Sequence, residues 1–383
     1  MAKVVGVLRE TFPGERCVAI VPRSVDVLAK AGFSVLIESG AGVAAGYTDD
    51  QYTSRGAGLA SRAEIFEKAE VLCQYRSIGA NPEAGKADLA QLRQGQIVMG
   101  MGEPLTAKVE TEALAKTGAS FFALELMPRI TRAQSMDILS SLATVSGYEA
   151  VLLAATHLPK MFPMFMTAAG TISPAKAFVI GAGVAGLQAI ATCKRLGAIV
   201  SAYDVRDAVK DQIVSVGAKF VSLAVETGQA EDKGGYAKAM GEDFYKKQRE
   251  LMLEVVKEHD VVISTAAVPG KKAPILITKE MVEAMQPGSV IIDLAATRGG
   301  NCELTKCGET VVHHGVTIIG PANLPGAAAY HASQMFSANT VTFLKHLNTF
   351  LPIPETIEDE IVRETLVTHK GAIVNTRVAE LFK

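Results

Sequence analysis

The chain has 383 residues, of which 49% are hydrophobic, and a formal net charge of −2 at pH 7. This length predicts two domains, each large enough to bury a core. The near-neutral charge gives no electrostatic reason to expect nucleic acid or an anionic membrane as a partner.

Nothing in the sequence predicts export, membrane insertion or a metal. The start lacks the apolar segment of a signal peptide, and the uncharged stretches 161–175 and 177–193 are too interrupted by proline or glycine for a confident membrane span. The five scattered cysteines suit a reducing cytoplasm. Cys302 and Cys307 lack zinc-ligand spacing, so we expect no metal site and place both in solvent-side loops.

Apolar runs alternate with helical patterns over the first 130 residues. The expected strands are 4–8, 34–38, 71–75, 97–101 and 121–126. The expected helices between them are 25–31, 63–69, 89–93 and 107–116. This alternation is typical of a mostly parallel sheet with helices on both faces.

A second α/β unit is expected after a helical segment over 132–158 that has a possible break near Gly147. Its strands would be 178–180, 199–204, 219–222, 261–264, 290–294 and 317–319, in the doubly wound order with a crevice between the first and the fourth. A long helix over 327–347 follows, and the last 30 residues return to the first domain. The fold class is therefore α/β, with two Rossmann-like doubly wound domains, 1–135 plus about 328–383 and 136–327.

A glycine-rich turn stands between the first strand of the second unit and its helix. Gly181 permits a tight turn, Gly183 lets a pyrophosphate approach the backbone, and Gly186 lets helix and strand pack closely. The N–H groups at the helix start attract phosphates. Asp204 ends the next strand, where a carboxylate binds the adenosine ribose and favours NAD(H) over NADP(H), although Arg206 nearby opposes this preference. An ordinary βαβ turn is the alternative.

Polar side chains gather just before the second unit. Gln134, Asp137 and Ser141 have the spacing of one helical face, with Ser140 beside them. Such groups can satisfy a nicotinamide carboxamide, and Arg129 could hold an oxygen or a ribose. Alternatively, Thr131 and Gln134 form a capping box and the rest is a hydrated surface. The residues alone leave both interpretations open.

One long polar segment, 226–248, interrupts the alternation of strands and helices. It has four glycines and is too long for an ordinary connection, which indicates a lid or a binding loop. Tyr236 and Met240 are the apolar side chains it could place on a ligand. A plain mobile surface loop is the alternative.

Several long motifs resemble one family. The segments 129–141, 166–170, 183–192, 234–238 and 287–295 closely resemble the NAD(H)-binding component of proton-translocating nicotinamide nucleotide transhydrogenase, a resemblance that covers nearly the whole chain. It implies that NAD(H) is the cofactor and that the chain is a soluble homodimer. It also implies partner subunits that bind NADP(H) and span the inner membrane, to which this cytoplasmic chain would be peripheral.

The resemblance also implies residue roles. The nicotinamide would be oriented, without acid or base chemistry, by Arg129, Gln134, Asp137 and Ser140. The other cofactor-binding residues would be Ile130, Thr131, Arg132, Gly181, Gly183, Val184, Ala185, Gly186, Asp204, Val205, Arg206, Gly235, Tyr236, Gln248 and Ala267. Hydride would pass from NADH directly to NADP⁺ on a partner.

Alanine dehydrogenase has a similar fold and is the relative to exclude. Cys17 stands where that enzyme has an arginine, Gln74 where it has its substrate lysine, and Thr297 near its catalytic aspartate; its histidine has no counterpart in 98–102. Its substrate machinery is therefore missing. An oxidoreductase acting on a small amino or keto acid and an NAD-sensing binding module without turnover stay as alternatives.

Overall fold

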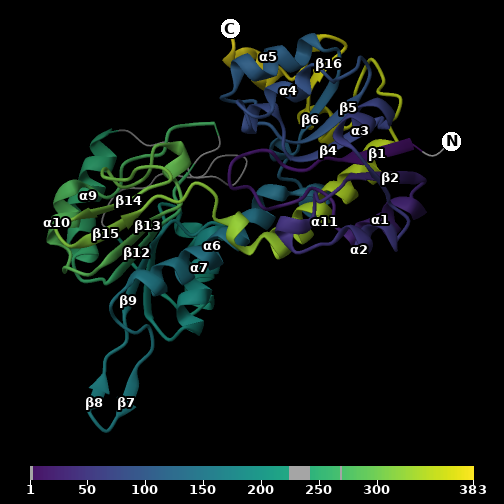
Figure 1. Ribbon diagram of the computed structural model, residues 1–383. Coiled ribbons are helices and arrows are strands. Elements are labelled where there is room, and N and C mark those ends of the chain that lie inside the picture. Colours follow the sequence, from purple (N-terminus) through teal and green to yellow (C-terminus); the bar gives the residue numbers. More distant parts are fainter. Residues whose placement is uncertain (1–2, 224–241, 268–269) are drawn as a thin grey trace. The chain divides into compact units, whose positions relative to one another are not determined.

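The computed structural model describes residues 3–223, 242–267 and 270–383. The chain divides into two compact units, one made of Met1–Leu142 with Pro325–Lys383 and the other of Ala143–Leu324. The sequence placed these boundaries at 135/136 and 327/328. Figure 1 shows both units as sheets flanked by helices.

The first unit is built on an eight-stranded sheet with the order β17-β16-β6-β5-β4-β1-β2-β3. The strands from β6 to β3 are parallel, whereas β16 pairs antiparallel with both β6 and β17. The strands are β1 (Lys3–Val7), β2 (Phe33–Glu38), β3 (Gly58–Ala60), β4 (Val71–Arg76), β5 (Ile97–Met101), β6 (Ser120–Ala123), β16 (Leu366–His369) and β17 (Ala372–Ile373). The five predicted strands are therefore present, the C-terminal segment adds β16 and β17, and the edge strand β3 was not predicted.

Helices surround this sheet, and one of the predicted helices is wrong. The α-helices are α1 (Pro22–Lys30), α2 (Asp49–Thr53), α3 (Arg62–Lys68), α4 (Lys86–Leu89), α5 (Lys108–Lys116), α11 (Ala329–Asn348), α12 (Glu360–Thr365) and α13 (Thr376–Leu381); the 3₁₀ helices are η1 (Val43–Ala45), η2 (Ile78–Ala80), η3 (Leu124–Leu126), η4 (Thr131–Met136) and η7 (Pro325–Ala328). Instead of a helix over 89–93, α4 ends at Leu89. Arg93 instead donates to the carbonyls of Phe66 (3.1 Å) and Ala69 (3.0 Å) at the end of α3.

The second unit contains a seven-stranded sheet with the order β11-β10-β9-β12-β13-β15-β14. Its strands are β9 (Lys176–Ile180), β10 (Ile199–Tyr203), β11 (Lys219–Phe220), β12 (Val261–Ser264), β13 (Val290–Asp293), β14 (Thr310–His313) and β15 (Val316–Ile319). The six predicted strands occur in the predicted doubly wound order. The edge strand β14 was not predicted, and it pairs antiparallel with β15.

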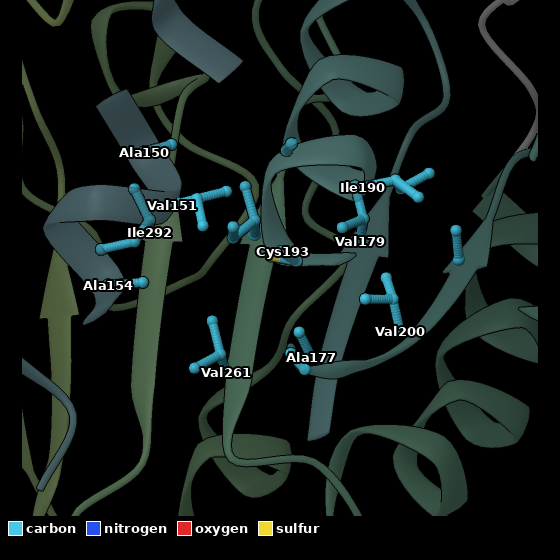
Figure 2. Close-up of a cluster of buried hydrophobic side chains, with 14 of the residues drawn as sticks. Ala150, Val151, Ala154, Ala177, Val179, Ile190, Cys193, Val200, Val261 and Ile292 are labelled. Carbon is cyan, nitrogen blue, oxygen red and sulfur yellow. The ribbon is translucent and has the colours of Figure 1, made fainter. Parts of the chain in front are cut away.

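Helices on both faces of this sheet build its core. They are α6 (Ile138–His157), α7 (Val184–Arg195), α8 (Lys210–Ser215), α9 (Glu242–Val256) and α10 (Lys279–Ala284), with the 3₁₀ helices η5 (Asp207–Val209) and η6 (Ala296–Arg298). Figure 2 shows one face of the sheet, where Val179, Val200, Val261 and Ile292 lie among residues of α6 and α7. A hairpin of β7 (Phe165–Thr167) and β8 (Gly170–Ile172) extends away from this sheet (Figure 1).

The predicted break near Gly147 is wrong, because α6 is continuous from Ile138 to His157. A Cβ at Gly147 would lie 2.2 Å from the carbonyl oxygen of Ala185, so glycine is required there for close packing against α7. Within the described residues, α6 is the one helix long and apolar enough to span a membrane by length and composition. Its Ala150, Val151 and Ala154 are buried in the core of the second unit (Figure 2).

Candidate dinucleotide-binding site

The second unit has the chain reversal that produces a ligand crevice in doubly wound folds. β9 lies between β10 and β12, so the connections after β9 and β12 leave in opposite directions. The N–H of Gly181, after β9, donates to the carbonyl of Tyr203 (2.8 Å). The N–H of Thr265, after β12, donates to the carbonyl of Ile180 (2.8 Å). These bonds align the carboxyl ends of three adjacent strands at one edge.

The three glycines after β9 have three different surroundings. Gly181 has a φ of +94°, a conformation that favours glycine. A Cβ at Gly186 would lie 1.8 Å from the carbonyl oxygen of Gly181, so no side chain fits between strand and helix. A Cβ at Gly183 would meet no atom within 4 Å. The turn is therefore tight where it must pack and open at the position expected to face a pyrophosphate.

The N-terminus of α7 points its N–H groups to this open space. Gly183 is the N-cap and provides no side-chain cap, and the first turn contains no acidic residue. Val184 is exposed and Ala185 is half-buried. A helix start without side-chain acceptors offers unpaired N–H donors to an anion.

Asp204 follows β10 and joins the glycine turn to Arg206. Its Oδ2 accepts a hydrogen bond from the N–H of Ala182 (2.7 Å). The Arg206 guanidinium donates from Nε to Oδ1 and from Nη2 to Oδ2, both at 2.9 Å. Asp204 is 6% exposed, so this is a buried, two-pronged ion pair. The sequence identified both residues but did not predict their pairing.

A second buried carboxylate, which no sequence motif singled out, organises the loops after β12 and β13. Asp293 is fully buried and accepts hydrogen bonds from the N–H groups of Ala295, Asn301 and Cys302 and from the hydroxyls of Ser264 and Thr305. Because Cys302 is buried here, its expected place in a solvent-side loop is wrong, whereas Cys307 is exposed. The described residues contain no cluster of metal-ligating side chains.

Asn301 connects this network to the loop after β12. Its Oδ1 accepts from the N–H of Ala266 (3.1 Å), and its Nδ2 donates to the carbonyls of Ala266 (2.8 Å) and Pro274 (2.9 Å). The predicted site residue Ala267 follows directly and is exposed. Asn301 therefore holds in place the backbone of Ala266, directly before Ala267.

Gln248 was expected at the end of a loop, but the structure places it in a helix. It lies in α9 and is 2% exposed. Its Nε2 donates to the hydroxyl of Tyr203 (2.8 Å), while its Oε1 is buried and has no hydrogen-bond partner among the residues that the structure describes. Gly235 and Tyr236, the other predicted residues of this segment, lie outside the described residues.

The predicted nicotinamide residues belong to the first unit, and their local structure differs from both sequence interpretations. Thr131 starts the 3₁₀ helix η4, and no side chain caps that helix, so the capping box is absent. Asp137 separates η4 from α6, so Gln134 and Ser141 do not share one helix. Asp137 instead caps α6, accepting from the N–H (3.0 Å) and the hydroxyl (2.5 Å) of Ser140.

The side chains around η4 are mostly accessible. Arg129, Thr131, Arg132 and Gln134 are exposed, and Ile130 is half-buried. Arg132 forms an ion pair with Asp359 (2.8 Å), which also accepts from His346 and caps α12. These bonds and nearby charges lower the pKa of Asp359 to about 2 against the opposing effect of its burial.

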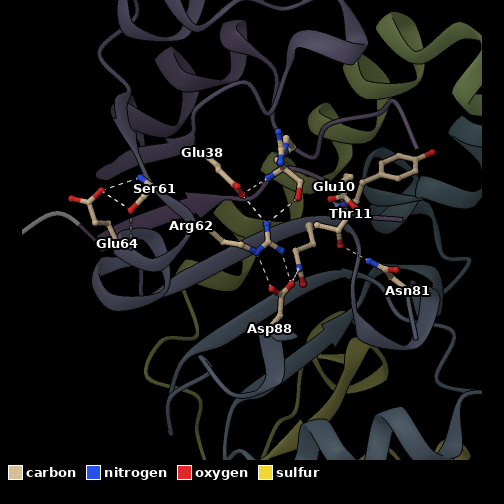
Figure 3. A network of polar contacts seen from close by, with 11 residues as sticks. Glu10, Thr11, Glu38, Ser61, Arg62, Glu64, Asn81 and Asp88 are labelled. Carbon is tan, nitrogen blue, oxygen red and sulfur yellow. Dashed lines mark hydrogen bonds and ion pairs between the residues drawn. The ribbon is translucent and has the colours of Figure 1, made fainter. Parts of the chain in front are cut away.

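The positions compared with alanine dehydrogenase lie in buried surroundings of the first unit. Cys17 is buried, and burial with the nearby Glu15 raises the pKa of its thiol. Gln74 is also buried and donates to Asp88 (3.1 Å), which forms a two-pronged ion pair with Arg62 (Figure 3). Thr297 lies in η6 of the second unit. Gln74 thus has a partner within the fold and carries no charge.

The doubly wound sheet, the open glycine turn and the acidic residue at the end of β10 define a two-unit α/β protein with a Rossmann-like dinucleotide-binding unit. Comparison with known families gives the more particular assignment. The chain belongs to the alanine dehydrogenase/PNT family, since the N-terminal domain of that family matches residues 6–146 and the C-terminal domain matches residues 150–376. The domains of this family bind NAD(H).

Similar proteins cover almost the whole chain. The first part of NAD(P) transhydrogenase subunit alpha from Rhodospirillum rubrum is 48% identical over 97% of both chains, and its counterpart from Rickettsia prowazekii is 41% identical over 98% of this chain and 97% of its own. A solved transhydrogenase structure from Sinorhizobium meliloti is 40% identical, with a TM-score of 0.85 over 98% of this chain and 99% of its own. An L-alanine dehydrogenase structure (24% identical, TM-score 0.81, 99% of both chains) has a similar fold.

Proposed function

We propose that this chain is the NAD(H)-binding subunit of a proton-translocating transhydrogenase and presents NADH for direct hydride transfer to NADP⁺ on a partner subunit. The observation that carries the proposal is the open glycine turn at the start of α7, in a chain 48% identical to a transhydrogenase alpha subunit. The proposed enzyme is a Re/Si-specific NAD(P)⁺ transhydrogenase that needs its partner subunits for activity.

The pyrophosphate is assigned to the glycine turn. The space beside Gly183 admits a phosphate, and the N–H groups around Val184, Ala185 and Gly186 supply donors and a positive dipole end. The adenosine ribose is assigned to Asp204, Val205 and Arg206 at the end of β10. Gly235, Tyr236, Gln248 and Ala267 complete the proposed lining.

The nicotinamide end is assigned to the residues around η4. Arg129, Gln134, Asp137 and Ser140 offer donors and acceptors that suit a carboxamide, and Ile130, Thr131 and Arg132 line it. Hydride transfer between two nicotinamides needs alignment and exclusion of water, but no protein acid or base. These side chains therefore act by orientation.

The surroundings of Gln74 and Cys17 support this function over dehydrogenation of an amino acid. Binding a 2-keto acid calls for cationic groups that hold its carboxylate, and imine chemistry calls for a proton donor. Gln74 is neutral and is hydrogen-bonded to Asp88, and burial raises the pKa of the Cys17 thiol, which keeps it protonated. Neither group supplies a cation.

The partners follow from the proposed reaction. One partner must hold NADP(H), and another must conduct protons across the inner membrane, to which this cytoplasmic subunit is peripheral. The chain itself is proposed to act as a homodimer. The relatives named as an alpha subunit support an assembly of more than one polypeptide.

Three assays on the purified chain separate the proposed function from its rivals. Mixing with an NADP-binding partner should give hydride transfer from NADH to NADP⁺. Oxidation of NADH with pyruvate and ammonia would instead identify an amino-acid dehydrogenase. Binding of NADH with turnover in neither assay would identify a sensing module, and absence of NADH binding would refute all three.

A further inference from the structure

The peptide that joins Gly181 to Ala182 is held from both sides. Its carbonyl accepts a hydrogen bond from the Thr265 hydroxyl (3.1 Å), and its N–H donates to Oδ2 of Asp204 (2.7 Å). Thr265 follows β12 and Asp204 follows β10, so the two strands that flank β9 provide one contact each. This peptide cannot rotate without losing two hydrogen bonds. The first peptide of the glycine turn is therefore fixed in one orientation.

Thr265 is itself anchored through its backbone. Its N–H donates to the carbonyl of Ile180 (2.8 Å), and its hydroxyl lies 3.3 Å from the same oxygen. The next residue, Ala266, has both of its backbone polar groups bonded to the side chain of Asn301, which is fully buried. The hydroxyl of Thr265 is therefore carried by a segment that is held at two successive residues.

The Gly181 carbonyl lies against the first turn of α7. A Cβ at Gly186 would lie 1.8 Å from its oxygen and 3.3 Å from the Thr265 hydroxyl oxygen. The N-cap Gly183 provides no side-chain cap, so the N–H groups of this turn are the donors to which an unpaired carbonyl beside it would turn. They are also the donors that the proposed function assigns to the pyrophosphate. The Thr265 hydroxyl gives the Gly181 carbonyl a different partner.

We propose, as an inference that rests on the proposed function, that Thr265 is a positioning residue of the pyrophosphate subsite. Its hydroxyl keeps the Gly181 carbonyl from competing with the phosphates for the N–H groups at the start of α7. The glycine motif ends at Gly186, whereas Thr265 is 84 positions from Gly181 and reaches the turn from a different strand. The turn is therefore completed by a residue outside the motif.

The test compares NADH, measured by calorimetric titration, with ADP and adenosine, measured by competition against NADH. ADP keeps the pyrophosphate, whereas adenosine lacks it. Thr265→Val keeps the shape of the side chain but removes the donor. We expect it to bind NADH and ADP about fivefold more weakly, the factor that corresponds to one hydrogen bond, and to bind adenosine as the unmodified chain does. Thr265→Ser keeps the hydroxyl and should retain all three affinities.

Thr192→Val is the matched control. The hydroxyl of Thr192 also donates to a backbone carbonyl of the second unit, that of Gln188 (2.8 Å), but it does so toward the C-terminal end of α7. Loss of this donor should leave the affinities for NADH and ADP unchanged, because it does not touch the glycine turn.

Three results would overturn the proposal. They are a loss of NADH and ADP affinity of less than about twofold in Thr265→Val, an equal loss for adenosine, which would indicate general loosening of the site, and a Thr265→Ser variant that binds ADP as weakly as Thr265→Val. If Thr265→Val does not fold by circular dichroism, Thr265→Ala makes the same comparison. An unmodified chain that binds no NADH would refute the proposed function itself, whereas unchanged binding in Thr265→Val would leave that function standing.

Discussion

Gly183 and Gly186 are three residues apart, yet an added methyl group would meet opposite surroundings at the two positions. At Gly183 it would enter open space, and the backbone there (φ −74°, ψ −167°) suits any residue. At Gly186 it would collide with the carbonyl of Gly181. At the residue scale, the fingerprint therefore separates an open position, to which the proposed function assigns the pyrophosphate, from one needed for packing.

This difference predicts two distinct alanine phenotypes. Gly183→Ala should change the free energy of unfolding by less than about 0.5 kcal/mol and weaken NADH binding by about tenfold or more, because the methyl occupies the proposed phosphate space. Gly186→Ala should destabilise the fold by about 3 kcal/mol. Urea unfolding and calorimetric titration measure the two effects; unaltered NADH affinity in Gly183→Ala would contradict the assignment.

Asp137 has a structural role that must be separated from its proposed role at the nicotinamide. Asp137→Ala should lose about 1 kcal/mol of stability with the cap of α6 and should slow hydride transfer, while phosphate binding persists. Asp137→Asn keeps an oxygen that accepts from the Ser140 N–H, so its free energy of unfolding should match that of the unmodified chain. Its hydride transfer should be as slow as that of Asp137→Ala. Stopped-flow transfer rates check this, and transfer at the unmodified rate in Asp137→Ala would count against the assignment.

The sequence predicted single residues well only where a local motif defines them. The spacing was sufficient for Gly181 and Gly186, because a tight turn and close packing of helix and strand depend on backbone geometry within one turn. The role of Gly183 at a pyrophosphate stays a prediction. The bonds of Asn301 to Ala266 and of Gln248 to Tyr203 join residues 35 and 45 positions apart. Neither has a local signal, so they depend on the tertiary fold.

At the scale of elements, buried parallel strands were the most predictable feature. β4, β5, β12 and β13 are mostly apolar and almost wholly buried, as expected for strands covered on both faces. The edge strands β3, β14 and β17, the neighbouring strand β16 and the hairpin β7–β8 were missed, since strands of two to four residues give too short an apolar pattern. The loop expected up to Gln248 ends earlier, because α9 already begins at Glu242.

The contact of Glu125 with the backbone after β5 predicts that the stability of the fold depends on pH. Glu125, in η3 after β6, accepts from the N–H groups of Gly102 (2.7 Å) and Glu103 (2.6 Å) after β5, where Glu103 has a φ of +49°. Its second oxygen, Oε2, is buried and accepts no hydrogen bond from the described part of the chain. Burial, with the charge of Glu103, raises the pKa of Glu125 to about 7.

Proton linkage gives the direction in which Glu125 makes the stability of the fold change with pH. Between about pH 4.5 and 7 the folded chain keeps a proton on Glu125 that the unfolded chain releases, so stability falls as the pH rises through this window. The slope from one proton is at most about 1.4 kcal/mol per pH unit. Glu125→Gln removes this contribution, so the difference in unfolding free energy between the two proteins should vary with pH. A difference that is constant across the window would contradict the pKa assignment.

At the scale of the whole molecule, the alternation of strands and helices predicted two α/β units, and the topology of each sheet shows why the chain forms them. β16 pairs with β6, which attaches the C-terminal segment to the first sheet, while β9 to β15 complete the second. The family resemblance, and not composition, pointed to transhydrogenase, because two nicotinamides exchanging hydride leave no acid–base signature in a sequence.

The proposed function requires that this chain align a reduced coenzyme for direct hydride transfer to a second coenzyme. The most direct measurement follows deuterium from NADH labelled on the transferred position of C4, in a mixture of this chain, its NADP-binding partner and NADP⁺. We expect the deuterium to appear in NADPH without exchange with water. Loss of the label to solvent would contradict the proposed function. So would appearance of the label on the α-carbon of alanine when the chain alone is given pyruvate and ammonia.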